Sequence, residues 1–176
     1  MRVMKIDEIA AEPWKNGGGT TRTIAARNGD WRVSIAEVGR DGPYSRFDGI
    51  ARISCVLRGA GAMLRHGDDV VALKPYHPTC YDGAIAWQAA LIGGPVSALN
   101  VMTRIGQYRA RVCAIEAKTV AQAGCVVALD APCRIGNHDV LDAGHALVID
   151  RLEQAIEIAP LSDTYSPPVL VTIESI

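Results

Sequence analysis

The sequence has no surplus of either charge. Its 18 lysine and arginine residues face 19 aspartate and glutamate residues, which leaves a formal net charge of −1 at pH 7. Nucleic-acid binding needs clustered basic side chains that neutralise phosphates. No basic tail or block is present to supply them. We therefore expect no nucleic-acid partner.

Targeting and membrane-spanning signals are missing as well. The first residues, MRVMKIDEIAAEPW, lack the apolar segment of a signal peptide. No apolar run approaches the ~20 residues that a membrane-spanning helix requires. With 49% hydrophobic and 21% charged residues in 176, the composition is that of an ordinary globular protein. We expect a cytoplasmic protein that contacts no membrane.

Patterns for disulfides and metal sites are also absent. The cysteines are odd in number and include no C-x-x-C pair or zinc-like spacing, so reduced thiols that pack as small hydrophobic residues are expected. The histidines show no H-x-H or H-E-x-x-H spacing, and neither a metal nor another cofactor is predicted. The residues concerned are Cys55, Cys80, Cys113, Cys125 and Cys133, and His66, His77, His138 and His145.

Short β-rich runs bounded by Gly, Pro, Asn and Asp dominate the chain, whereas helical periodicity is weak. This pattern is typical of a sandwich or barrel, and it predicts an all-β fold. Strands are expected at 20–27, 30–38, 51–57, 62–65, 70–73, 86–92 and 96–102, and then at 108–115, 125–129, 146–149, 155–158 and 169–173. Because the pattern restarts near residue 106, we expect two lobes, 1–105 and a smaller 106–176.

One hairpin can be predicted in detail. Asn28-Gly29 suits a type I′ turn between strands 20–27 and 30–38, and opposite residues then have numbers that add up to 57. The predicted pairs are Thr23 with Ser34, Arg22 with Ile35 and Ala25 with Arg32. In this register Arg32 and Ser34 share one face, while Arg22 lies among apolar residues on the other.

Four features have both a structural and a functional interpretation. Arg22 on an apolar face either snorkels to solvent, pairs with a buried carboxylate or meets an anionic ligand. Arg52 shares one face of its strand with Ser54, and it belongs either to a solvent-facing stripe or to the same anion site. Asn100, inside an apolar strand, contacts either a ligand or a loop. The glycine-rich loop 13–19 either clamps a ligand or is a mobile turn.

Several segments together resemble the HutD/Ves family. They are 13–19 (PWKNGGG), 21–22 (TR), 31–36 (WRVSIA), 42–47 (GPYSRF), Arg52, 57–59 (LRG), 81–83 (YDG) and 99–104 (LNVMTR). Their order and spacing match through Arg104, and beyond it the match is a general one in length and strand pattern. The chain departs from the family pattern at Tyr44, usually Phe, at Asp48, often Pro, at Thr23, often Glu, and at Ala51, often an acid.

The resemblance implies a bicupin, with two RmlC-like jelly-roll β-barrel lobes, no metal-binding histidines and a ligand pocket in the N-terminal lobe. It also implies a non-enzymatic regulator that moderates histidine utilisation by binding a small carboxylate such as formylglutamate. Because arginine grips carboxylates with paired donors, the arginines acquire a common role. The expected ligand-binding residues are Trp14, Lys15, Asn16, Arg22, Arg32, Ser34, Arg52, Asn100 and Met102.

An enzyme is the alternative interpretation. A metal-independent cupin-type isomerase or lyase acting on a small carboxylate could use His66, His77 or Tyr81 as its general base. No G-x-S-x-G motif or catalytic triad is present, so no catalytic residue is nominated. The choice between a monomer and a homodimer is open.

Overall fold

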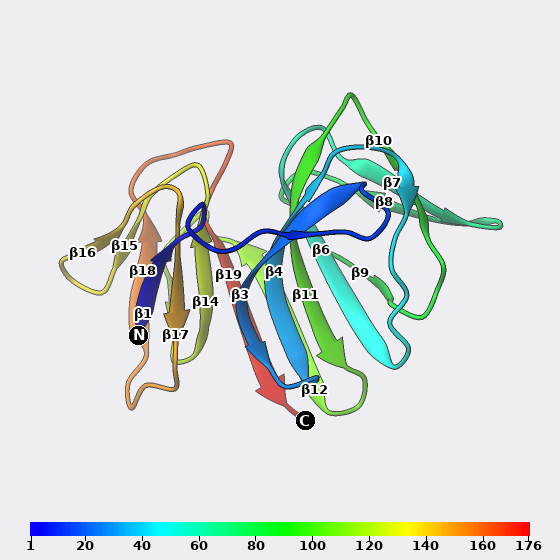
Figure 1. Ribbon diagram of the computed structural model, residues 1–176. Coiled ribbons are helices and arrows are strands. Elements are labelled where there is room, and N and C mark those ends of the chain that lie inside the picture. Colours follow the sequence, from blue (N-terminus) through cyan, green and yellow to red (C-terminus); the bar gives the residue numbers. More distant parts are fainter. The chain divides into compact units, whose positions relative to one another are not determined.

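The computed structural model describes residues 1–176 and contains strands, turns and loops without a helix. Figure 1 shows this all-strand chain. No helix capable of crossing a membrane is present. The chain divides into two compact units, which we call the N-terminal lobe (Ala10–Arg109 with Ser175–Ile176) and the C-terminal lobe (Ala110–Glu174 with Met1–Ile9). The prediction of an all-β fold is confirmed.

Two sheets build the N-terminal lobe. The larger has the order β2 (Glu12–Pro13), β3 (Gly19–Arg27), β4 (Trp31–Val38), β11 (Val96–Arg104), β6 (Ile50–Arg58) and β9 (Thr79–Asp82). The smaller has the order β5 (Gly42–Pro43), β10 (Gln88–Leu91), β7 (Ala62–His66) and β8 (Asp69–Leu73). The two sheets share one core, in which Val38 and Val56 of the larger sheet cluster with Leu64 and Leu73 of the smaller.

The C-terminal lobe repeats this two-sheet plan. Its larger sheet has the order β1 (Arg2–Lys5), β17 (His145–Ile149), β14 (Gly124–Ala128), β19 (Val169–Ser175) and β12 (Tyr108–Ala114). Its smaller sheet has the order β13 (Thr119–Ala121), β18 (Ile156–Pro160), β15 (Cys133–Ile135) and β16 (Asp139–Leu141). Val126 and Leu147 from the first sheet pack with Ile135 and Ile158 from the second, so this lobe also has its own core.

The first nine residues differ from the predicted lobe assignment. β1 pairs antiparallel with β17, from Arg2 opposite Val148 to Lys5 opposite His145. The Ile6 amide extends this contact by donating to the carbonyl of Gly144 over 2.8 Å. The segment predicted to open the N-terminal lobe is therefore part of the C-terminal lobe, because the backbone groups of a strand are satisfied by its sheet neighbour and not by its neighbours in sequence.

The hairpin β3–β4 forms, but its turn differs from the prediction. The Asp30 amide donates to the Arg27 carbonyl over 2.7 Å, and Gly29 has a φ of 74° whereas Asn28 has no positive φ. A positive φ at the third turn residue alone is the type II pattern, so the predicted type I′ turn is wrong. The strands consequently pair from Arg27 opposite Trp31, one residue later than expected.

A β-bulge restores the predicted register farther along this hairpin. The register shifts between Thr23 and Ala25, so Arg32 lies opposite Ala26 and not opposite Ala25. Beyond the bulge, Thr23 lies opposite Ser34 and Arg22 opposite Ile35, as predicted. The extra residue in the bulge compensates for the longer turn. The face assignments of Arg22 and Ser34 are therefore correct although the turn is not.

Candidate functional site

A pocket of about 610 Å³ opens in the N-terminal lobe on one face of the six-stranded sheet. Beneath it, two rows of directly opposite residues cross β4, β11 and β6, and all of them except the buried Ser54 line the pocket. One row is Arg32, Met102 and Arg52, and the other is Ser34, Asn100 and Ser54. Because every second residue of a strand points to the same side of a sheet, the two rows share this face.

Eight of the nine predicted ligand-binding residues line this pocket. They are Trp14, Lys15, Asn16, Arg32, Ser34, Arg52, Asn100 and Met102. Arg22 is the exception, because its neighbour Thr21 lines the pocket and successive residues of a strand point to opposite faces. The structure therefore does not bring Arg22 together with Arg32 and Arg52. The hairpin register had already separated Arg22 from Arg32, and only the resemblance had grouped them.

Arg52 is buried among aromatic rings, with 6% of its surface exposed. The guanidinium carbon lies 5.0 Å from the ring centre of Tyr81, 5.3 Å from that of Tyr44 and 5.7 Å from that of Phe47. Its Nη1 donates to the Ser45 carbonyl over 3.4 Å, while its buried Nε has no hydrogen-bond partner. The ring quadrupoles stabilise the cation, and no carboxylate pairs with it.

Arg32 has a similar environment at the other end of the same row. Its Nη2 donates to the Met102 sulfur over 3.4 Å, and its buried Nε lacks a partner. The guanidinium carbon lies 5.8 Å from the ring centre of Phe47. Phe47, the single phenylalanine of the chain, therefore contacts both arginines. Neither arginine takes part in an ion pair with a carboxylate.

The second row contains a buried hydrogen-bond chain. The Ser54 hydroxyl donates to Asn100 Oδ1 over 2.6 Å, and it lies 2.7 Å from the hydroxyl of Tyr81. Asn100 Nδ2 makes one long contact of 3.5 Å with the Ala98 carbonyl. Asn100 thus has a structural bond, but its partner Ser54 lies on strand β6 and not in a loop, where one interpretation of its strand position expected it. Asn100 also lines the pocket, as the other interpretation expected.

The glycine-rich loop closes one side of the pocket. The Trp14 amide donates to the Gly19 carbonyl over 2.9 Å, and the Trp14 indole donates to the Thr21 hydroxyl over 2.8 Å. Asn16 accepts from the Gly18 amide over 2.9 Å and donates to the Pro43 carbonyl over 3.1 Å. Both ends of the Asn16 side-chain amide therefore make hydrogen bonds that fix the loop at the side of the pocket.

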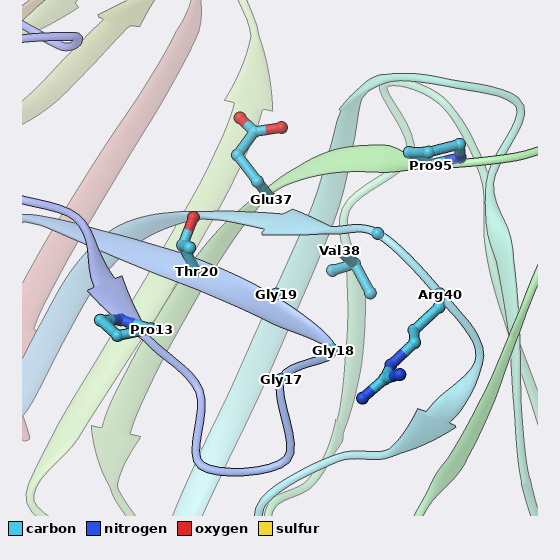
Figure 2. A pocket seen from close by; sticks show the side chains of 10 residues that line it. Pro13, Gly17, Gly18, Gly19, Thr20, Glu37, Val38, Arg40 and Pro95 are labelled. Atoms are coloured by element: carbon cyan, nitrogen blue, oxygen red, sulfur yellow. The ribbon is translucent and has the colours of Figure 1, made fainter.

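The same loop borders a second hollow of about 440 Å³. Figure 2 shows the Arg40 side chain reaching toward Gly17 while Glu37 points away from it. Arg40 Nη2 donates to the Asn16 carbonyl over 2.5 Å, so its charge supports the loop. Glu37 accepts from the Ser97 hydroxyl over 2.6 Å. Both charged side chains that line this hollow therefore make hydrogen bonds within the lobe.

The three candidate general bases are poorly placed for catalysis in the pocket. His66 and His77 are exposed, interact with the carbonyls of Ala86 and Pro75, and do not line the pocket. Burial raises the pKa of the Tyr81 hydroxyl, and this effect exceeds the opposing influence of Arg52. A protonated tyrosine cannot accept a proton at neutral pH. None of the three candidates therefore supports the enzyme alternative.

Three of the five thiols are buried, and no cluster of metal-ligating side chains is formed. Burial raises the pKa of the Cys55 and Cys133 thiols to about 11 and that of Cys125 to about 12, which keeps these cysteines protonated. No group of three or more His, Cys, Asp or Glu side chains is arranged to hold a metal ion.

Comparison with known proteins identifies the family. Residues 6–163 match the family model HutD. The chain belongs to the HutD family. Its curated relatives include an uncharacterised 21.2 kDa protein from the hutC 3′ region of Pseudomonas putida, 32% identical over 119 residues, and protein Ves of Citrobacter koseri, 34% identical over 119 residues. Each alignment covers 64% of this chain, but only 63% and 62% of the respective relatives.

Solved structures extend the similarity to the whole chain. HutD from Pseudomonas fluorescens SBW25, described for a formate condition, has a TM-score of 0.84 at 25% identity, covering 99% of this chain and 98% of that one. A cupin 2 conserved barrel domain protein from Leptotrichia buccalis has a TM-score of 0.61 at 9% identity, covering 99% and 96%, and this likeness concerns the fold alone. The predicted bicupin fold and HutD/Ves membership are confirmed, and the family's name links it to histidine utilisation.

Sequence reasoning missed the groups that surround the arginines. Tyr44 and Phe47 lie in a segment that carried the family resemblance, yet neither was assigned to the site. Ser54 shares the face of Arg52 by simple alternation, which could have identified it. Tyr81 lies directly opposite Arg52 on the neighbouring strand β9, a pairing that the proline-bounded sequence around it does not reveal.

Proposed function

We propose that this chain is a non-enzymatic ligand-binding protein that moderates histidine utilisation by binding a small carboxylate such as formylglutamate. The observation that carries the proposal is the pair of guanidinium groups, Arg32 and Arg52, whose buried Nε atoms have no partner in a pocket of the N-terminal lobe. A buried charge and an unpaired buried donor are both costly. A ligand carboxylate beside the guanidinium groups would compensate their charge.

The dimensions of the pocket suit a small dicarboxylate. Its volume of about 610 Å³ is within the range of small-molecule sites. Arg32 and Arg52 are separated by the single strand β11, so their backbones are roughly 10 Å apart at the usual strand spacing. Both side chains reach the ring of Phe47, which brings the two guanidinium groups toward one ligand.

Two of the similar proteins point to the same chemistry and pathway. The HutD structure from Pseudomonas fluorescens is described for a formate condition, and formate is the smallest carboxylate. The Pseudomonas putida relative is encoded in the hutC 3′ region. These facts concern the relatives, and they support the proposal without identifying the ligand of this chain.

Calorimetry tests the proposal with formylglutamate, glutamate, formate and urocanate as ligands. We expect saturable binding of at least one carboxylate, and Arg52→Ala should weaken it by about tenfold to 100-fold, since a charged hydrogen bond contributes roughly 1.5–3 kcal/mol. Arg65→Ala, which removes an exposed arginine of the same lobe outside the pocket, is the matched control. Absence of binding to all four ligands, or their conversion to products by the wild-type protein, would contradict the proposal.

A further inference from the structure

The buried chain of Tyr81, Ser54 and Asn100 has a fixed direction. Ser54 carries one hydroxyl proton and donates it to Asn100 Oδ1 over 2.6 Å. In its 2.7 Å contact with Tyr81, Ser54 must therefore accept, and the Tyr81 hydroxyl donates. Burial raises the pKa of Tyr81, so this donor keeps its proton. The order of donation is Tyr81 to Ser54 to Asn100.

This order fixes the orientation of the Asn100 amide. With Oδ1 held by Ser54, Nδ2 is the end that lies 3.5 Å from the Ala98 carbonyl. The reversed amide would place Oδ1 against that carbonyl, and two acceptors repel each other. Because the contact to Ala98 is long, Nδ2 retains donor capacity in the pocket that Asn100 lines.

The centre of the pocket therefore presents donors. The unpartnered Nε atoms of Arg32 and Arg52 flank the central strand that carries the Asn100 amide. Glu12, the one carboxylate of the lining, is exposed on the edge strand β2. A carboxylate accepts hydrogen bonds at both oxygens, whereas a carboxamide presents an N–H₂ group to at least one of these donors. The Asn100 amide would thus distinguish a ligand carboxylate from a ligand carboxamide.

We propose that Ser54 and Tyr81 are positioning residues that give the pocket its preference for a carboxylate over the corresponding carboxamide. The inference rests on the proposed function, because it describes the selectivity of the same pocket. Tyr81 does not line the pocket, and Ser54 does not line it either. Both act through Asn100: without the Ser54 hydroxyl, only the long 3.5 Å contact with the Ala98 carbonyl opposes rotation of the amide, and the rotated amide would offer its oxygen to the N–H₂ of a carboxamide.

Paired ligands make the test specific. Calorimetry compares glutarate with glutaramate, which has the same shape and one carboxamide in place of a carboxylate. We expect the wild-type protein to prefer glutarate by about tenfold, equivalent to about 1.4 kcal/mol. Ser54→Ala should reduce that ratio to about threefold or less by weakening glutarate binding while sparing glutaramate. Tyr81→Phe, which keeps the ring beside Arg52, should reduce it in the same direction but less.

A matched control separates positioning from general damage. Ser97→Ala removes another buried serine hydroxyl of the same lobe, one that donates to Glu37 and lies outside the pocket, and it should leave the ratio unchanged. Equal losses for both ligands in Ser54→Ala, or an unchanged ratio in both Ser54→Ala and Tyr81→Phe, would overturn the inference. The proposed function would stand in either case, because the wild-type protein would still bind the carboxylate. Failure of the wild-type protein to bind glutarate and every other carboxylate tested would overturn the proposed function together with the inference.

Discussion

The two lobes have the same two-sheet architecture, yet their interiors differ in chemistry. The core cluster of the C-terminal lobe contains aliphatic residues and one cysteine, for example Val126, Leu147 and Ile158. Every buried polar or charged residue of the chain is in the N-terminal lobe: Ser34, Arg52, Ser54, Ser97, Asn100 and Thr103. A jelly-roll interior can thus be filled by packing alone, and the polar residues of the N-terminal lobe are not required by the architecture.

This difference teaches where function is located. Buried charges cost free energy and rarely increase stability over an apolar residue of similar size. The N-terminal lobe retains a buried arginine without a carboxylate partner, and this is the lobe in which we propose the binding site. The apolar lobe shows what the same fold looks like without a buried arginine. Mutations in the two lobes should therefore separate stability from binding.

Truncation in the apolar core should have the largest effect on stability. Leu147→Ala removes a buried side chain from the C-terminal core and should lower the free energy of unfolding by about 2–5 kcal/mol. Urea unfolding followed by circular dichroism measures this loss. Leu161→Ala, at an exposed position of the same lobe, should change it by less than about 0.5 kcal/mol. Equal effects of the two substitutions would show that Leu147 is not a core residue.

Replacement of Arg52 by a residue of similar length should have the opposite pattern, with a large effect on carboxylate affinity and little effect on stability. Arg52→Met should leave the free energy of unfolding unchanged or raise it by about 1 kcal/mol, because it removes an incompletely paired buried charge. Carboxylate affinity should fall by about tenfold to 100-fold in the same protein. Parallel unfolding and calorimetric titrations test this. A clearly destabilised protein with normal affinity would mean that Arg52 is a structural residue.

Loss of the shared aromatic contact should have a smaller effect. Phe47→Leu keeps an apolar side chain but removes the ring beside Arg32 and Arg52. Each of the two cation–π contacts contributes about 0.5–1 kcal/mol, so carboxylate affinity should fall by about fivefold to 30-fold. Fluorescence-detected thermal unfolding gives the stability of the variant without ligand, and its shift with added ligand gives the carboxylate affinity. Wild-type affinity in Phe47→Leu would exclude a role for the ring in holding the arginines.

The smallest effect near neutral pH comes from the buried tyrosines of the N-terminal lobe. Burial raises the pKa of Tyr44 and Tyr81, so the unfolded chain loses these protons at lower pH than the native protein does. Their contribution to stability is complete below pH ~10, the ordinary tyrosine pKa, and is lost as the pH rises further. Unfolding free energies measured from pH 7 to pH 11 should decline less in Tyr81→Phe. An identical decline in both proteins would contradict this assignment.

Local sequence signals were sufficient to predict on which face of its own strand a residue lies. Alternation correctly placed Arg32 with Ser34 on one face of β4, and it correctly placed Arg22 on the other face. The short strands β1, β2, β5, β9, β13, β15 and β16 were missed, because two to four residues are too few to show a period of two. The hairpin turn was also wrong, since the Asn28-Gly29 pair is compatible with more than one turn type.

The sequence by itself determined the all-β class, the family and the identity of eight residues that line the pocket. Only the tertiary structure decided that these eight residues surround one pocket, that Met1–Ile9 join the C-terminal lobe, and that aromatic rings surround Arg52. The physical reason is the sequence separation of the deciding contacts. Ser54 meets Asn100 across 46 residues and Arg32 meets Met102 across 70, and strand periodicity carries no information about which distant strands become neighbours.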